Sequence, residues 1–173
     1  MNQFFVTLTA AIFALMLVTG CSSADNVKDS SPTAVGAIQA PAEYDLSTPE
    51  SAVRSYLAAI SFAYRTGNSE AASATMTAWE GVRVDSYIEL NRQQSRGIEQ
   101  TLTAFEVLES SGEEPTMTVT ADEAWAYRYF ALADGSYQSE ELTAAYRSQY
   151  TVVNSGGIWL VDKVQVTPAG EVK

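Results

Sequence analysis

The sequence predicts an α+β domain in which N-terminal helices pack on a four-stranded antiparallel sheet. Apolar residues recur at helical spacing before Gly97 and mostly at every second position after it. Helical segments followed by a run of strands are typical of the α+β class. Turn sequences separate the later alternating segments, at Asp134-Gly135 and at residues 154–157, and the second of these turns is predicted to form a hairpin of the last two strands.

The first helix is predicted to begin at Thr48, whose hydroxyl can cap it, with Pro49 in the first turn and Glu50 near the positive helix end. Gly67 is predicted to end this helix. The apolar residues between them form one stripe at helical spacing: Val53, Tyr56, Leu57, Ile60 and Tyr64.

Two further helices are predicted before the strands. Asn68 can cap a short helix over residues 69–77, and a third helix covers about residues 82–95, with Gly97 predicted to end it. One side of the third helix carries its more apolar residues: Val84, Tyr87, Ile88 and Asn91. Four strands follow, over residues 101–109, 116–132, 142–153 and 158–166, the second kinked near Asp122 and Glu123.

The N-terminal segment has the pattern of a secretory signal. Residues 4–19 are almost wholly apolar, and the run is short for a bilayer core of ~30 Å. The following stretch, Leu17-Val18-Thr19-Gly20-Cys21, resembles the bacterial lipobox. This resemblance implies cleavage before Cys21, attachment of lipid to its thiol, and anchoring to the extracytoplasmic face of a cell membrane or outer membrane. An uncleaved anchor or a buried apolar helix is the alternative.

These patterns divide the chain into four parts. Residues 1–20 are predicted to be the signal peptide, 21–46 the lipidated cysteine with a disordered tether, 47–167 the folded domain and 168–173 a C-terminal tail. The tether is rich in Ser, Ala, Pro, Asp and Thr and has few large apolar residues.

Composition excludes several classes of function. The chain has 173 residues and a net charge of −11, so binding to nucleic acid is disfavoured. It contains no His, which excludes a Ser-His-Asp triad, a Cys-His pair and imidazole metal ligands. Its one cysteine is Cys21, so no internal disulfide can form. No cofactor and no metal are predicted.

The order of segments resembles the NTF2-like superfamily, also called cystatin-like or SnoaL-like, over residues 47–167. The resemblance lies in the Thr48-Pro49-Glu50 start and in the closing segment, where Trp159 follows a tight turn and begins the last strand. Trp125 and residues 146–166 also resemble the IMS domain of plastid-division proteins. The superfamily implies a curved sheet and a conical pocket between sheet and helices, and it does not imply one activity. Many of its members form a homodimer through the sheet, but the resemblance leaves the oligomeric state of this chain open.

Two carboxylates are candidates for a general base. In a regularly alternating strand, Asp162 and Glu106 would each lie on the same face as apolar residues. A carboxylate on an apolar face has a raised pKa unless it is paired. The apolar neighbours are Ile158, Leu160, Val164 and Val166 for Asp162, and Leu102, Ala104 and Leu108 for Glu106. The alternative is an ion pair to Arg128 or Arg147, or an exposed position.

Aromatic residues in the strands are candidates for ligand binding, because a tyrosine offers a hydroxyl inside an apolar cavity. The candidates are Tyr127, Tyr129, Tyr146 and Tyr150, with Arg147 as a clamp for an acidic ligand. Core packing of the rings and cross-strand pairing of the arginine are the alternatives.

The favoured function is a lipid-anchored, non-enzymatic binding or scaffolding module outside the cytoplasm, with an unknown protein or small-molecule partner. One alternative is a pocket enzyme, an isomerase, dehydratase or hydrolase with a carboxylate base. Another is a carrier of a small molecule or peptide. An enclosed cavity with Asp162 or Glu106 directed into it would favour the enzyme.

Overall fold

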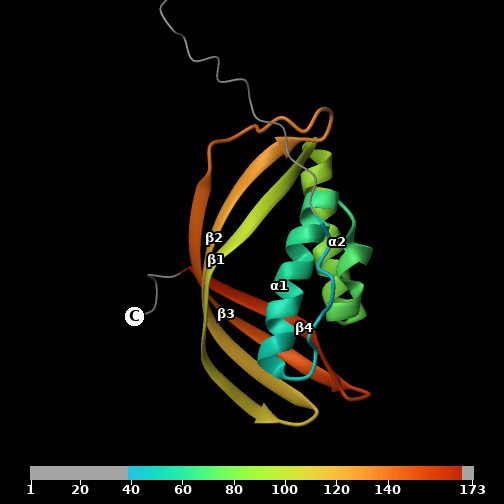
Figure 1. Cartoon of the computed structure of the whole chain (residues 1–173), viewed down its shortest axis with the longest axis vertical. Coiled ribbons are helices and arrows are strands. Elements are labelled where there is room, and N and C mark those ends of the chain that lie inside the picture. The colour runs from blue at the N-terminus through green and yellow to red at the C-terminus, as the bar shows by residue number, and fades with distance from the viewer. Residues whose placement is uncertain (1–38, 169–173) are drawn as a thin grey trace, which may run out of the picture. The chain divides into compact units, whose positions relative to one another are not determined.

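The structure is a computed structural model that describes residues 39–168; the predicted signal peptide, Cys21, most of the predicted tether and nearly all of the predicted C-terminal tail lie outside these residues. Helices come first and strands follow, as predicted (Figure 1). The elements are α1 (Pro49–Thr66), the 3-10 helix η1 (Ser69–Thr75), α2 (Ala78–Gln93), β1 (Arg96–Glu113), β2 (Thr116–Ala131), β3 (Leu142–Ser155) and β4 (Ile158–Pro168). Across residues 39–168, no helix has the length and hydropathy needed to cross a membrane.

The first helix begins and ends where the sequence predicts. Thr48 caps α1 by accepting a hydrogen bond from the Ser51 amide at 3.1 Å, and Ser51 Oγ accepts one from the Thr48 amide at 3.1 Å. Gly67 follows the last turn with φ of 65°, a left-handed conformation that a residue with a Cβ adopts at a cost. These local interactions, all within a few residues, define the two ends of the helix.

The third helix starts four residues before the predicted position. Thr77 caps α2, and its amide donates a hydrogen bond to the Val161 carbonyl of β4 at 2.9 Å. A contact between segments distant in sequence therefore sets the helix start. Gly97 does not end this helix: α2 ends at Gln93, and Gly97 lies in β1, where a Cβ would overlap the ring of Phe130.

The strands form one antiparallel meander in the order β1-β2-β3-β4, which confirms the predicted sheet. The sheet is curved, and α1 and α2 lie on the same side of it (Figure 1). Bulges interrupt the register at three residues that have no cross-strand partner: Thr103 and Leu108 in β1, and Asp162 in β4. Each bulge moves the following side chains to the opposite face of the sheet.

Contacts of the folded domain begin upstream of the predicted boundary at residue 47. The Tyr44 hydroxyl donates to the Ala71 carbonyl at 3.2 Å, and the Trp159 amide donates to the Leu46 carbonyl at 2.9 Å. Both Tyr44 and Leu46 pack against the hydrophobic core. The last residues of the predicted tether are therefore part of the folded unit.

Candidate functional site

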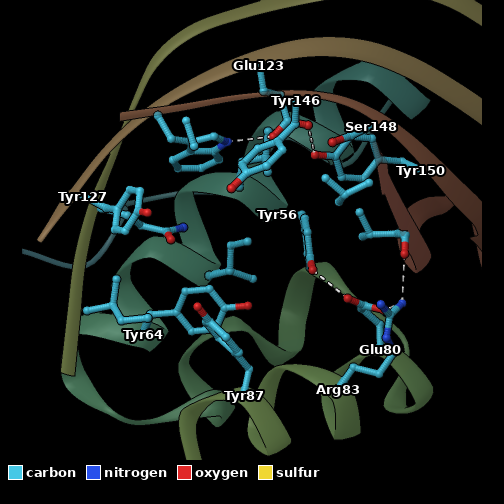
Figure 2. Close-up of a pocket in the computed structure, with 18 of the residues that line it drawn as sticks. Tyr56, Tyr64, Glu80, Arg83, Tyr87, Glu123, Tyr127, Tyr146, Ser148 and Tyr150 are labelled. Carbon is cyan, nitrogen blue, oxygen red and sulfur yellow. Dashed lines mark hydrogen bonds and ion pairs between the residues drawn. The ribbon is translucent and has the colours of Figure 1, made fainter. Parts of the chain in front are cut away.

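A cavity of about 480 Å³ lies between the sheet and the two helices (Figure 2). Its walls come from both layers: α1 and α2 on one side, and β1 to β4 on the other. Seven tyrosines share the lining with Trp125 and two glutamates, Glu80 and Glu123. The tyrosines are Tyr56, Tyr64, Tyr87, Tyr127, Tyr129, Tyr146 and Tyr150.

The tyrosines of the sheet reach the cavity because strand periodicity places them there. On β2, Tyr127 and Tyr129 are two residues apart, and the pairing of β2 with β3 contains no bulge. On β3, Tyr146 and Tyr150 occupy alternate positions of the same face. All four tyrosines that the sequence suggests as ligand contacts thus line one cavity.

Glu123 lies at the base of the cavity and is buried. Its carboxylate accepts a hydrogen bond from the Tyr150 hydroxyl and another from Trp125 Nε1 at 2.8 Å. Burial, followed by the charge and the hydrogen bond of Glu123, raises the pKa of Tyr150 well above its usual value. Within residues 39–168, no arginine or lysine forms an ion pair with Glu123.

Glu80 approaches the cavity from the opposite wall, on the first turn of α2 (Figure 2). Its carboxylate accepts hydrogen bonds from the Tyr56 hydroxyl at 2.7 Å and from Arg83 Nη1 at 3.0 Å. Burial raises the pKa of Glu80, although Tyr56 and Arg83 oppose the increase. The side chain of Arg83 is 47% exposed, so its charge lies at the mouth of the cavity.

Several polar groups at the cavity have no protein partner. Ser148 Oγ is fully buried and makes no hydrogen bond of acceptable geometry among the described residues, although it lies close enough to the Tyr150 hydroxyl to oppose the increase in the pKa of that group. The hydroxyls of Tyr64, Tyr127 and Tyr146 also form no hydrogen bond within residues 39–168. Buried polar groups in proteins are usually paired, so unpaired ones in a cavity can bind a ligand or water.

Asp162 and Glu106, the two carboxylates that strand alternation suggested as general bases, do not line the cavity. Asp162 occupies the β4 bulge, where it accepts a hydrogen bond from Thr77 Oγ1 at 2.8 Å, and it thereby supports the cap of α2. Glu106 is exposed, because the bulge at Thr103 turns Phe105 and Val107 toward the core instead. The assumption of uninterrupted alternation in these strands was wrong.

The suggested arginine clamp lies on the opposite face of the sheet. Arg147 donates to both oxygens of Asp122, with distances of 2.8 Å from Nε to Oδ1 and 2.8 Å from Nη2 to Oδ2. Arg128 pairs with Glu141 at 3.2 Å. These are cross-strand and surface pairs of the kind that the alternative interpretation describes.

Sequence reasoning missed Glu80 and Glu123. Glu123 lies on the same face of β2 as Ala121, Trp125 and Tyr127, because these are alternate residues of the strand. The alternation of β2 could therefore have placed Glu123 at the cavity. Glu80 precedes the predicted start of the third helix, and only the tertiary contacts of Thr77 place it on the first turn of α2.

Comparisons with known proteins show likeness of fold. No protein-family model and no curated protein sequence matches the chain. The intermembrane-space region of the chloroplast protein ARC6 is similar in structure, with a TM-score of 0.58 and 14% identity over 73% of this chain and 99% of that one.

Two other solved structures are more distant. A protein with a cystatin-like fold from Caulobacter vibrioides has a TM-score of 0.44 and 12% identity, over 70% of this chain and 90% of that one. The periplasmic domain of DotI has a TM-score of 0.47 and 12% identity, over 73% of this chain and 100% of that one. At these identities the similarity concerns the arrangement of helices and strands and does not identify an activity.

Proposed function

We propose that this chain is a bacterial lipoprotein whose NTF2-like domain binds a small organic ligand outside the cytoplasm, in the cavity between sheet and helices. The observation that carries the proposal is the set of unpaired polar groups at a cavity of about 480 Å³, above all the buried Ser148 hydroxyl. A volume of this size is typical of small-molecule sites, in which apolar walls carry a few polar groups.

The lipid anchor is supported by the sequence of residues 17–21. Between Cys21 and Tyr44, where contacts with the domain begin, a flexible chain would reach about 25 Å, enough to hold the domain clear of lipid headgroups. The proposal predicts that mass spectrometry of protein from bacterial membranes will find Cys21 N-terminal and acylated. Recovery of the intact chain with an unmodified thiol would contradict it.

Ligand binding can be tested by native mass spectrometry of the full-length protein released in a non-ionic detergent. We expect a small molecule to co-purify at a ratio of about 1:1 with the wild type. Ala144→Phe should abolish this adduct, because Ala144 lines the cavity and a larger side chain would occupy it.

Ala145→Phe is the matched control, since Ala145 is exposed on the other face of the same strand. Equal retention of the adduct by both variants would place the ligand elsewhere. Absence of any adduct from the wild type, together with no binding of added probes, would contradict the binding function.

A second candidate function is proton transfer catalysed by Glu80. The buried position of this carboxylate raises its pKa, which suits a general base. In that case the wild type would convert the co-purified molecule over time, and Glu80→Gln would bind it without converting it. Unchanged recovery of the bound molecule from the wild type after prolonged incubation would favour binding alone.

A further inference from the structure

We infer that the ligand is an organic cation, an ammonium group carried on a small apolar body; this inference rests on the proposed binding function. The first observation is the aromatic composition of the walls. Tyr64 and Tyr87 of the helices meet edge to face, with ring centroids 5.1 Å apart, and Tyr127 and Tyr129 of the sheet do so at 5.9 Å. Clustered aromatic rings with electron-rich faces are the usual receptors for ammonium groups.

The charges of the cavity have the matching sign. The carboxylates among its lining residues are Glu80 and Glu123; Arg83, also in the lining, pairs with Glu80 at the mouth, and Arg96, outside the lining, stacks on the ring of Tyr129. Both donors to Glu123, the Tyr150 phenol and the Trp125 indole, are neutral. The carboxylate of Glu123 therefore lacks a countercharge among residues 39–168, and a bound cation would supply it.

One ring of the lining already carries a cation on its face. The guanidinium carbon of Arg96 lies 3.8 Å from the ring centroid of Tyr129. This contact shows that the tyrosine cluster can hold positive charge against its faces. A ligand ammonium in the cavity itself would make the same kind of contact with Tyr64, Tyr127 or Tyr146 (Figure 2).

The unpaired hydroxyl of Ser148 adds an acceptor at the base of the cavity, beside Glu123 and Tyr150. A ligand that carries N–H or O–H donors next to its positive charge would satisfy this oxygen, whereas an anion would meet Glu123 at the same place. The net charge of the chain, −11, also raises the local concentration of cations around the protein.

The test compares three probes of equal shape and different charge by isothermal titration calorimetry on the full-length protein in a non-ionic detergent. Choline is the cation, 3,3-dimethylbutan-1-ol its neutral isostere and 3,3-dimethylbutanoate the corresponding anion. We expect choline to bind at least tenfold more tightly than the alcohol, and the anion not to bind. Methylammonium and tetramethylammonium then distinguish N–H donation from contact with ring faces alone.

Two variants test whether Glu123 and Tyr127 cause the preference for choline over the neutral alcohol. Glu123→Gln should reduce the choline-to-alcohol ratio to below threefold, while Glu106→Gln, the same charge change at an exposed position, should leave it unchanged. If Glu123→Gln fails to fold, Tyr127→Leu keeps the inference testable, because loss of this ring should lower choline affinity more than alcohol affinity.

The outcomes separate the inference from the function on which it rests. Equal binding of choline and the alcohol, or preferred binding of the anion, would overturn the cationic ligand class and leave a binding protein. A choline preference that persists in Glu123→Gln and Tyr127→Leu would also overturn it, because the cation would then bind elsewhere. Failure of every probe, with no co-purified molecule, would overturn the binding function itself.

Discussion

The face of β2 that points toward the helices has two different halves. Val119 and Ala121 are fully buried at one end, in the core cluster that includes Val53 of α1 and Val161 of β4. Farther along the same face, Glu123 is followed by Trp125, Tyr127 and Tyr129, and the cavity opens there. One uninterrupted alternation therefore supplies both a filled core and a hollow site.

The difference shows how side-chain type decides between packing and cavity on one backbone. Small aliphatic groups interdigitate between the layers at the density of a protein interior. Tyrosines are long and rigid and carry hydroxyls that need partners, so a group of them leaves polar space when those partners are absent. We call these regions the aliphatic half and the tyrosine half of the face.

The largest expected effect is loss of bulk from the core that packs on the aliphatic half. Trp159 of β4 is buried in the same core cluster as Val119 and Ala121, so Trp159→Ala should lower the free energy of unfolding by about 3–5 kcal/mol. Trp79→Ala is the matched control: this residue is 67% exposed, and the loss should stay within about 0.5 kcal/mol. Urea denaturation of both variants measures the difference, and similar losses would show that Trp159 is not a core residue.

A smaller effect is expected at the boundary between the halves. Tyr150→Phe removes the phenol that donates to buried Glu123, and should cost about 1–3 kcal/mol. Tyr146→Phe removes a phenol with no hydrogen-bond partner among residues 39–168, and should change stability by less than about 0.5 kcal/mol. Equal costs in thermal or urea unfolding would mean that the two phenols are equivalent, and the proposed boundary would fail.

The pH dependence of stability should report the buried Glu80 of α2, which lines the cavity together with the tyrosine half. Its pKa is raised above the usual 4.5, so the folded state binds more protons than the unfolded state at pH values between the two pKa values. Stability from this group is therefore greatest below about pH 4.5 and declines as the pH rises through its folded pKa. Relative to Glu80→Gln, the wild type should lose stability as the pH rises across this interval.

Unfolding midpoints measured at several pH values for the wild type and Glu80→Gln test that sign. Glu89→Gln, on the exposed side of the same helix, controls for the loss of one negative charge. A constant difference between wild type and Glu80→Gln at all pH values would show that burial does not perturb this carboxyl.

The smallest effect on stability is expected at Ser148, although the group matters for binding. Ser148→Ala removes a buried hydroxyl that makes no hydrogen bond of acceptable geometry within residues 39–168, so the unfolding free energy should change by less than about 0.5 kcal/mol. Choline affinity should nevertheless fall if this oxygen contacts the ligand. A loss of stability above about 1 kcal/mol would mean that the hydroxyl is hydrogen-bonded in the folded protein.

Much of the fold was predictable because the deciding interactions are local. Thr48 and Gly67 set the ends of α1 through hydrogen bonds and backbone conformation within a few residues. The four strands were located by alternation and turn residues, and β2 begins at Thr116 as predicted. The same alternation brings Tyr127 and Tyr129 to one face without any knowledge of their neighbours.

The strand bulges, the start of α2 and the identity of the cavity carboxylates depended on contacts between segments distant in sequence. The bulges at Thr103 and Asp162 arise from the register of whole strands, and each one turns the next side chains to the other face. The start of α2 depends on the contact of Thr77 with β4, which is what brings Glu80 to the cavity. Sequence by itself thus determined the elements and the tyrosines of the sheet, because propensity and periodicity act over short distances. Only the tertiary structure decided which carboxylates face those tyrosines, because strand register and helix position are set by contacts far apart in the chain.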